Sequence, residues 1–455
     1  MKETIVGKNA SLLRNVSLID MSGKGERIKK NKTVAIENGR IQSIHDAADR
    51  HEPPLKGHAV MDCGGGYLLP GLIDLHVHCT NPFISPREAI KLTRLAAVMG
   101  QVRENLRSCI RGGVTTVRDM GSPPGIALYM NMVDAGRMTG PRIVPSFSMI
   151  TCPGGYPDMV PPFRGIQRLL LGGQFAERIT GEEQAEQTVG RLADRGAAWI
   201  KTVYQEESYL FGHPRLAVLP DSAYGTIARA ARARNKKLAL HSLSLKGIRK
   251  GIELKVDTLE HLPLEELTAE DVRMIKDAGI TVIPTLIAPG MYREDLMPVL
   301  RNIITATDNY LVPQARKETL DIIGRVIAGK ESSTMIDCHF LRKKYGTMVK
   351  NLTRLREAGV RISFGTDAGG TDTCLFGLPW LEMRLMSEAG MGNYQILETA
   401  TRINAAVLGL GHELGTIETG RIADLVLVEG DPVKDLRNLS RVKKVWKSGE
   451  LVHGS

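Results

Sequence analysis

The sequence predicts an α/β protein, in which a (β/α)8 barrel carries a small β-sheet module formed by both chain ends. Three observations support this prediction. The first stretch of the chain and the last are rich in β-forming residues. Between them, short apolar runs alternate with long helical stretches, a pattern typical of βα units and parallel strands. The alternation supplies eight strand candidates, the number that closes such a barrel.

The size and composition of the chain fit this architecture. Its 455 residues are 42% hydrophobic and 24% charged, so a large core can form without disulfides. The formal net charge of +10 raises the options of nucleic acid, an acidic membrane surface or an anionic substrate. Because the basic residues are spread out and no aromatic-interleaved basic platform accompanies them, we expect a solvated surface and no nucleic-acid partner.

The cysteines and the first residues of the sequence indicate the cellular compartment to expect. Six cysteines occur singly and none forms a CxxC pair, which disfavours a zinc knuckle and a disulfide framework. The sequence MKETIVGKNASLLRN lacks the apolar segment and cleavage site of a secretory signal. No apolar run reaches the length of a membrane span. We therefore expect a cytoplasmic protein with no membrane partner.

The β-sheet module is expected from residues 1–68 and residues 411–455. The first part contains the runs SLLRNVSLID, KTVAIENGRIQSIHDA and HAVMDCGG, broken by Gly and Asn turns. Within it, ENGRI has the composition of a hairpin turn. The last part contains GTIETGRIADLVLVEGD and RVKKVWKSGELV. We expect the two parts to form one sheet module beside the barrel.

The barrel is expected from residues 69–410. Its strand candidates are LLPGLIDLHVH, GVTTVRDMG, PRIVPSFSMI, AAWIKTV, KKLALHSL, VDTLEHL, GITVIPTL and VRISFGTDA. Most follow an amphipathic helix that ends in Gly or Asn. Two connecting segments, residues 151–184 and 287–350, are long and follow strand ends, where an active-site lid would lie.

Polar side chains of the metal-binding types occur where these strand candidates end. His76 and His78 end the first strand, and residues two apart in a strand point to the same side, so both imidazoles can bind one metal ion. Four further groups end other strands, and these are Lys201, His241, His261 and Asp367. Because the carboxyl ends of barrel strands converge on one face, the sequence predicts one shared metal site there.

Each of these residues also has a simpler interpretation. A lone histidine at a strand end is often structural. Lys201 could extend its amine to solvent, although lysine is almost never buried without a partner. Asp367, which precedes Ala-Gly-Gly, could cap a helix. The coincidence of all six groups on five strand ends favours the shared site.

The runs LLPGLIDLHVH, WIKTV, LALHS, TLEH and SFGTDAGG, with the tail LETATRINAAVLGLGHELGTIETGRIADLVLVEGDPV, resemble the amidohydrolase superfamily. Within it they are similar to the imidazolonepropionase-like branch, which includes metal-dependent dipeptidases and related amide hydrolases. The resemblance covers nearly the whole chain. It implies a barrel flanked by a small β-sandwich built from both termini, and a homo-oligomer.

The resemblance also implies a division of the metal ligands. His76 and His78 would bind the more buried metal together with Asp367, which also handles protons. His241 and His261 would bind the second metal. Histidine and carboxylate ligands suit Zn²⁺, with Mn²⁺ or Fe²⁺ as alternatives.

Lys201 matches the lysine that reacts with CO₂ in the two-metal members, giving a carbamate that bridges the ions. Imidazolonepropionase lacks this lysine and uses one metal, so Lys201 predicts two. Two cations that share a water lower its pKa and supply hydroxide to attack an amide carbonyl. Asp367 would accept the proton and pass it to the leaving nitrogen.

The sequence departs from the family pattern at expected substrate contacts. Tyr156 stands where many relatives have a histidine after Gly-Gly; it either donates to a developing oxyanion or packs in its loop. Leu243 stands where peptidase relatives often have a tyrosine, which puts a dipeptide substrate in question. Tyr204 is a candidate substitute donor. Arg118 either binds a substrate carboxylate or forms a buried ion pair with Asp119.

The sequence therefore predicts a metal-dependent hydrolase that cleaves an amide C–N bond in a dipeptide, an N-acyl amino acid or a similar small molecule. The alternatives on the same site are opening of a cyclic amide or imidazolone, hydrolysis of a carbamate or urea, and deamination. The metal count and a substrate panel discriminate between them. A non-catalytic scaffold of the same fold is disfavoured, because all six ligands are present.

Overall fold

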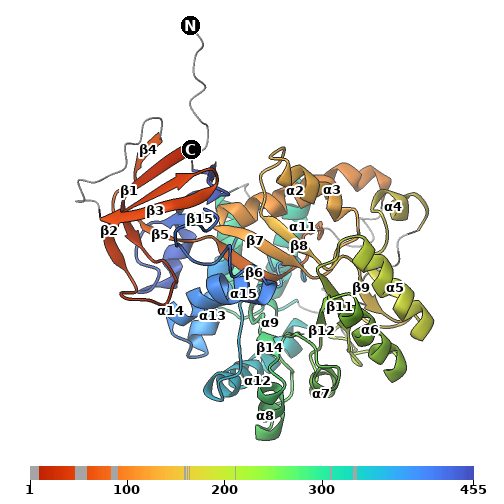
Figure 1. Ribbon diagram of the computed structural model, residues 1–455. Helices are drawn as coiled ribbons and strands as arrows, with labels where there is room; N and C mark the ends of the chain where they lie inside the picture. The colour runs from red at the N-terminus through yellow and green to blue at the C-terminus, as the bar shows by residue number, and fades with distance from the viewer. Residues whose placement is uncertain are drawn as a thin grey trace.

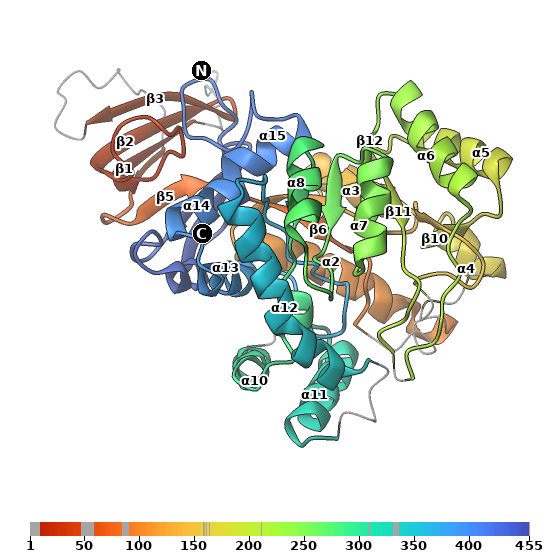
Figure 2. The same cartoon turned by 90° about the horizontal axis from the view of Figure 1, so that it is seen from below.

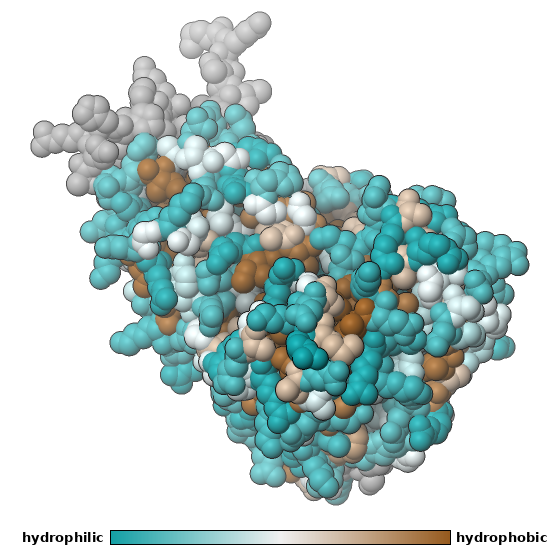
Figure 3. All heavy atoms as spheres, turned by 60° about the horizontal axis from the view of Figure 1, so that its bottom comes forward, coloured by the Kyte–Doolittle hydropathy of each residue, from teal (hydrophilic) through white to brown (hydrophobic). Residues whose placement is uncertain are grey.

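The computed structural model describes residues 10–46, 59–83, 91–157, 160, 162, 164–210, 212–307, 310–330 and 336–454. A β-rich part that holds both ends of the chain lies beside a larger part built of strands and helices (Figure 1). In the view of Figure 3 the surface is mostly hydrophilic, with smaller hydrophobic areas. No helix in the described ranges has the length and apolar character needed to cross a bilayer.

The two ends of the chain share one hydrogen-bonded sheet, which confirms that part of the prediction. The strand order is β17-β16-β15-β5-β1-β2-β3, and β4 pairs with β1. Its strands are β1 (Ala10–Leu18), β2 (Lys29–Glu37), β3 (Arg40–Asp46), β4 (Ala59–Asp62), β5 (Tyr67–Pro70), β15 (Leu425–Val428), β16 (Val442–Lys447) and β17 (Glu450–His453). Because β5 pairs with both β1 and β15, it joins the N-terminal strands to the C-terminal ones.

The predicted ENGRI hairpin is present between β2 and β3. Glu37 pairs with Arg40, so two residues form the turn. Asn38 and Gly39 have φ angles of 52° and 78°, the left-handed values that a tight hairpin requires at both positions. A Cβ on Gly39 would lie 2.9 Å from the carbonyl oxygen of Ser448, so only glycine fits there.

The larger part contains parallel strands in two hydrogen-bonded groups. The orders are β6-β7-β8 and β10-β9-β11-β12-β13-β14. These strands are β6 (Leu72–Val77), β7 (Val114–Asp119), β8 (Arg142–Pro145), β9 (Met149–Thr151), β10 (Ala176–Arg178), β11 (Trp199–Val203), β12 (Lys237–His241), β13 (Thr258–Glu260) and β14 (Thr281–Ile283). Most of their residues are buried, as expected of a parallel sheet that is covered on both faces.

Helices alternate with these strands. Figures 1 and 2 show α5, α6, α7 and α8 on the outside of β11 to β14. The α-helices are α2 (Leu95–Arg111), α3 (Ile126–Asp134), α4 (Gly165–Leu170), α5 (Glu182–Asp194), α6 (Asp221–Ala233), α7 (Leu245–Glu253), α8 (Ala269–Asp277), α9 (Ile287–Gly290), α10 (Leu296–Ala306), α11 (Pro313–Ile327), α12 (Cys338–Glu357), α13 (Pro379–Glu388), α14 (Asn393–Glu398) and α15 (Asn404–Leu408). Shorter helical turns are η1 (Leu92–Arg94), η3 (Thr399–Ile403) and η4 (Leu436–Ser440).

Three predicted strands differ in detail. LLPGLIDLHVH divides at Gly71, where a Cβ would lie 2.1 Å from Thr115 Oγ1, into β5 of one sheet and β6 of the other. PRIVPSFSMI divides into β8 and β9 around Phe147, whose φ is 57°. VRISFGTDA is not a regular strand. It makes single bridges, from Ile362 to β14 and from Ala368 to β6.

Backbone contacts connect the two groups of parallel strands. Residues 362–368 lie between β14 and β6 through the two bridges just described. On the other side, the amide of Ala198, next to β11, donates to the carbonyl of Pro145 in β8 at 3.0 Å. The carboxyl ends of β6, β11, β12 and β13 each carry a predicted metal ligand within the strand or directly after it.

Candidate metal centre

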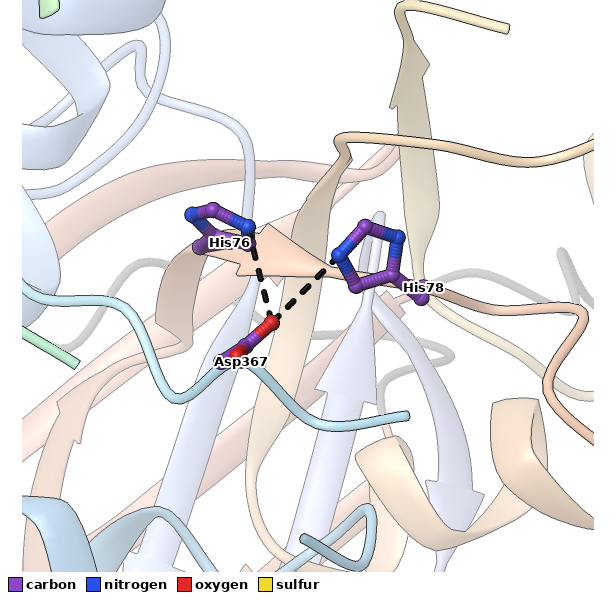
Figure 4. Close-up of side chains that lie close together, drawn as sticks. All are labelled: His76, His78 and Asp367. Atoms are coloured by element: carbon purple, nitrogen blue, oxygen red, sulfur yellow. Dashed lines mark ion pairs between the residues drawn. The ribbon is translucent and has the colours of Figure 1, made fainter. Parts of the chain in front are cut away.

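His76 in β6, His78 directly after it and an aspartate meet at the carboxyl end of the parallel strands. The Nε2 atoms of His76 and His78 lie 3.5 Å and 3.4 Å from Oδ1 of Asp367 (Figure 4). One ligand atom from each residue falls within 4.8 Å of the other two, and all three residues are buried. The predicted His-x-His arrangement, with both rings on the same side of the strand, is therefore present.

In three imidazoles of the site, the Nδ1 atom lies within hydrogen-bonding distance of an oxygen atom. His76 Nδ1 lies 2.6 Å from Glu260 Oε2, and His261 Nδ1 lies 2.6 Å from Thr285 Oγ1. His78 Nδ1 lies 3.0 Å from the carbonyl of Gly121. When Nδ1 carries the proton and donates it to such an acceptor, Nε2 keeps a free lone pair, which is the usual arrangement of metal-binding histidines.

Four buried atoms of the predicted ligands have no hydrogen-bond partner. They are Nε2 of His76, Nζ of Lys201, Nε2 of His241 and Oδ1 of Asp367. Buried polar atoms are nearly always satisfied, because a missing partner costs about 1–3 kcal/mol each. Four such atoms in one place, on nitrogen and carboxylate donors, fit a site for divalent cations.

The other predicted ligands adjoin the first three. The ring centroids of His76 and His261 lie 4.8 Å apart, and those of His241 and His261 lie 4.6 Å apart. Lys201 is fully buried on β11, and its charge contributes to the lowered pKa of both His76 and His241. The structure thus brings all six predicted ligands together, although only His76, His78 and Asp367 form a tight group.

Burial favours the neutral forms that bind metals. It lowers the pKa of His76 and His241 well below the usual value, and that of His261 to about 3. Burial also lowers the pKa of Lys201 to about 8. His78 is the exception: burial lowers its pKa, but the adjacent carboxylate of Asp367 outweighs burial, so the pKa is raised.

A buried carboxylate that the sequence analysis missed lies beneath His76. Glu260, in β13, holds the Nδ1 side of that imidazole, and its Oε1 accepts from Arg118 at 2.7 Å and from Thr258 Oγ1 at 2.5 Å. Burial raises the pKa of Glu260, but the charges of Arg118 and Lys201 outweigh it and hold the pKa below its usual value. The available signal was a charged residue inside the apolar run VDTLEHL.

Arg118 lies below the metal cluster, where it is fully buried and outside the pocket lining. Besides Glu260, it donates to the carbonyl of Leu75 at 2.6 Å, and its guanidinium lies 4.3 Å from the ring centre of Trp199. This position favours the structural alternative over contact with a substrate carboxylate. The partner is Glu260 and not the expected Asp119, which accepts from the amide of Cys79 and from Ser122.

The two tyrosines proposed as donors lie in different surroundings. Tyr156 stacks on His241, with centroids 4.3 Å apart and an interplanar angle of 15°, and it lines the pocket. Its hydroxyl lies 3.0 Å from that of Tyr209, which the sequence analysis missed because no motif marks it. Tyr204 is outside the lining and packs near Tyr224, so its position does not support a donor role.

A pocket opens over this cluster. Tyr156, Tyr209, His241, His261 and Asp367 line one end of it. The rest of its wall comes from the loops after β12 and β13, from α9 and α12, and from Thr285 and Thr371. A substrate group that reaches the metal ligands therefore also contacts connecting segments.

Three non-glycine residues of the site have left-handed backbone angles. The φ values are 75° for His261, 45° for Thr285 and 56° for Asp367. Such conformations cost on the order of 1–3 kcal/mol each and are concentrated at functional sites. A Cβ on Gly370 would lie 2.3 Å from Asp367 Oδ1, so glycine leaves room for this carboxylate.

Several known proteins have similar sequences and folds. An imidazolonepropionase from Sphingopyxis alaskensis is 24% identical over 447 residues, which cover 92% of each chain. The structure of a Xaa-Pro dipeptidase with bound methionine superimposes with a TM-score of 0.73 at 23% identity, covering 97% of this chain and 99% of the other. The Aspergillus niger ochratoxinase gives 0.72 at 19% identity, with coverage of 98% and 97%.

The match to a protein-family model is more decisive. The model of the amidohydrolase family matches residues 67–452, which include every predicted metal ligand and the strands β5, β15 and β16 of the terminal sheet. By this match the chain belongs to the amidohydrolase family.

Proposed function

We propose that this protein uses two divalent metal ions to hydrolyse an amide C–N bond. Membership of the amidohydrolase family makes it a hydrolase that acts on C–N bonds. The proposal of two metal ions rests on four buried atoms without hydrogen-bond partners. These atoms belong to His76, Lys201, His241 and Asp367. A single cation held by His76, His78 and Asp367 would leave the atoms of Lys201 and His241 unsatisfied.

We propose the matching architecture as well. Residues 69–410 would close into a (β/α)8 barrel, flanked by a β-sandwich from residues 1–68 and 411–455. Two observations support closure, namely the Ala198–Pro145 hydrogen bond and the bridges of residues 362–368 to β14 and β6. In such a barrel, catalytic groups come from the carboxyl ends of several strands.

His76, His78 and Asp367 would hold one ion, and His241 and His261 the other. Lys201 would bridge them as the carbamate formed when its neutral amine bonds to the carbon of CO₂ and loses a proton. The lowered pKa of Lys201, about 8, supports this reaction because it increases the neutral fraction. The product is an anion, which suits a place between two cations. Zn²⁺ fits the ligands best, with Mn²⁺ or Fe²⁺ as alternatives.

When bound by these residues, two divalent ions would acidify a water molecule and polarise the substrate carbonyl. Asp367, held in a left-handed conformation beside both histidines, accepts the proton of the attacking water. It then gives this proton to the amide nitrogen, which leaves readily only when protonated. Tyr156, stacked on His241, can donate its hydroxyl proton to the carbonyl oxygen as negative charge develops there.

Metal analysis followed by a substrate screen tests the proposal. We expect two divalent ions per chain, loss of activity with a chelator, and recovery when Zn²⁺ is restored. The screen covers dipeptides, N-acyl amino acids, alkyl and aryl amides, ureas and carbamates. Protein that holds no metal and hydrolyses substrates equally well with chelator would contradict the proposal.

The variant Lys201→Ala tests the bridging group. We expect loss of one metal and of activity, with partial recovery in formate or acetate, because a small carboxylate can replace the carbamate. Lys237→Ala is the matched control: this half-buried lysine begins β12 and donates to the carbonyl of Val407. One metal per chain and no effect of Lys201→Ala would favour the deaminase or imidazolone alternatives.

A further inference from the structure

We propose that the substrate carries an uncharged apolar group, and not a carboxylate, in the part of the pocket away from the metal ligands. This inference rests on the proposed function and narrows its substrate class. It arises from an apolar wall, defined here as Leu243, Leu264, Ala288, Pro289, Leu341 and Met348.

The apolar wall comes from four separate segments. Leu243 and Leu264 follow β12 and β13, and the amide of Leu264 donates to the carbonyl of Leu243 at 2.9 Å. Ala288 and Pro289 belong to α9, and Leu341 and Met348 to α12. Because all four segments contribute an apolar side chain to one surface, a bound group there would lose water on several sides.

No lysine or arginine occurs among the described residues that line the pocket. The basic side chains near the pocket interact with other groups. Arg118 lies beneath the site and binds Glu260, and Lys201 belongs to the metal cluster. Arg342, on α12, donates through Nε to the carbonyl of Tyr292 at 2.9 Å. A carboxylate against the apolar wall would therefore find no positive partner in the lining.

The energetic preference follows from burial. A carboxylate that loses water without gaining a charged or hydrogen-bonded partner is strongly disfavoured, whereas an alkyl or aryl group gains from the same burial. Four hydroxyl residues line the pocket, but each hydroxyl has a protein partner and none carries a charge: Tyr156 and Tyr209 pair with each other, Thr285 pairs with His261, and Thr371 lies 3.4 Å from Thr373. Substrates whose carboxylate would lie against the apolar wall therefore fit less well than neutral amides.

Leu243 is the position where the wall is easiest to change. It lies two residues after the ligand His241, is half-buried, and its amide donates to Gln205 Oε1 at 3.2 Å, which fixes the backbone. Its side chain contacts the pocket without taking part in the metal cluster. An arginine at this position would supply the missing cation.

The test compares two hydroxamates of equal length, since a hydroxamate binds the metal centre without being hydrolysed. One ends in an isopropyl group and the other, glutaric acid monohydroxamate, ends in a carboxylate. Calorimetry on the zinc-loaded protein is expected to show the isopropyl compound binding at least about tenfold more tightly, because only its end is compatible with an apolar wall. Leu243→Arg should remove or reverse this preference.

The matched control is Leu243→Gln, which adds polarity and length without charge and should weaken the isopropyl compound without reversing the preference. The inference is overturned if the wild-type protein binds the two compounds equally or binds the carboxylate more tightly. Either result would still agree with the proposed metal centre. If neither compound binds, the metal centre itself fails and the inference fails with it. The wild-type comparison decides the question even if Leu243→Arg does not fold.

Discussion

The two ends of the pocket are built in different ways. At the metal end, every predicted ligand except Asp367 lies on or directly after a parallel strand, and a buried network that includes Glu260 and Arg118 supports the site. At the other end, the apolar wall comes from loops and from α9 and α12. The contrast separates two tasks: strand ends hold reacting groups at fixed positions, while connecting segments select the group that is bound. Substitutions at the two ends should therefore differ in kind as well as in size.

The largest effect is expected for Asp367→Asn. The amide keeps the shape of the side chain but cannot accept the proton of the attacking water, so kcat should fall by roughly 10²–10⁴-fold. Steady-state kinetics and metal analysis together separate a lost proton acceptor from a lost ion. Asp372→Asn, five residues on and outside the lining, is the control and should stay near the wild-type rate. A nearly active Asp367→Asn would remove this residue from the mechanism.

Glu260→Gln tests the support beneath the metal end. The variant weakens the hold on His76 Nδ1 and leaves the buried Arg118 without its charged partner. Loss of such a carboxylate partner typically costs about 10–100-fold in metal affinity, and we expect that range here. Competition with a coloured chelator measures it. Thr258→Val, which removes one donor to Glu260 and one acceptor for Arg118 but no charge, should have a smaller effect; equal effects would contradict the assignment.

Tyr156→Phe probes the boundary between the two ends. It removes one neutral hydroxyl, so activity should fall only about 2–10-fold if that group donates a single hydrogen bond. Tyr209→Phe is the informative partner, because it breaks the same Tyr–Tyr contact but leaves the Tyr156 hydroxyl. A larger loss in kcat for Tyr156→Phe than for Tyr209→Phe assigns the donor to Tyr156, and the opposite order assigns it to Tyr209.

The smallest effect on activity is expected for Glu382→Gln, behind the apolar wall. Glu382 is fully buried and accepts from the amides of Leu286 and Ile287 at 2.9 Å and 2.6 Å. Burial raises its pKa from 4.5 to about 8. A carboxyl whose folded pKa is raised stabilises the fold fully below its unfolded pKa, and this stability is lost as pH rises towards the folded value.

The metal-free wild-type protein should therefore lose stability between about pH 4.5 and 8 in a way that Glu382→Gln does not. The slopes of unfolding free energy against pH should differ by up to about 1.4 kcal/mol per pH unit, the value for one proton. Urea denaturation at several pH values in that window measures the difference. Parallel pH profiles would show that Glu382 ionises normally in the fold.

The sequence allowed the metal end to be predicted, because its ligands depend on local rules. His76 and His78 alternate along one strand, and Lys201 interrupts a buried run, so each is visible within a few residues. Glu260 was missed since its role depends on Arg118, which is 142 residues away in the chain. Leu341 and Met348 were expected only as part of a helical segment, because their place in the wall depends on how α12 packs.

The prediction of the fold was limited in the same way, because local patterns do not show contacts between distant residues. Helix and strand alternation predicted the parallel strands, but VRISFGTDA was expected as a strand and is irregular. The left-handed angle at Asp367 interrupts it, and Gly365 packs against His76 so closely that a Cβ would lie 3.0 Å from the Cβ of that residue. The apolar pattern of the segment indicates that it is buried. The pattern does not show the left-handed backbone conformation at Asp367, which interrupts the strand.

The position of β5 between β1 and β15 has a consequence for synthesis on the ribosome. Strands β1 to β5 emerge well before β15, so the edge of β5 that binds β15 stays open while residues 71–424 are made. An open strand edge invites pairing with other chains. Nascent chains that stall before residue 425 should therefore depend on chaperones, and the last step of folding follows translation of β15.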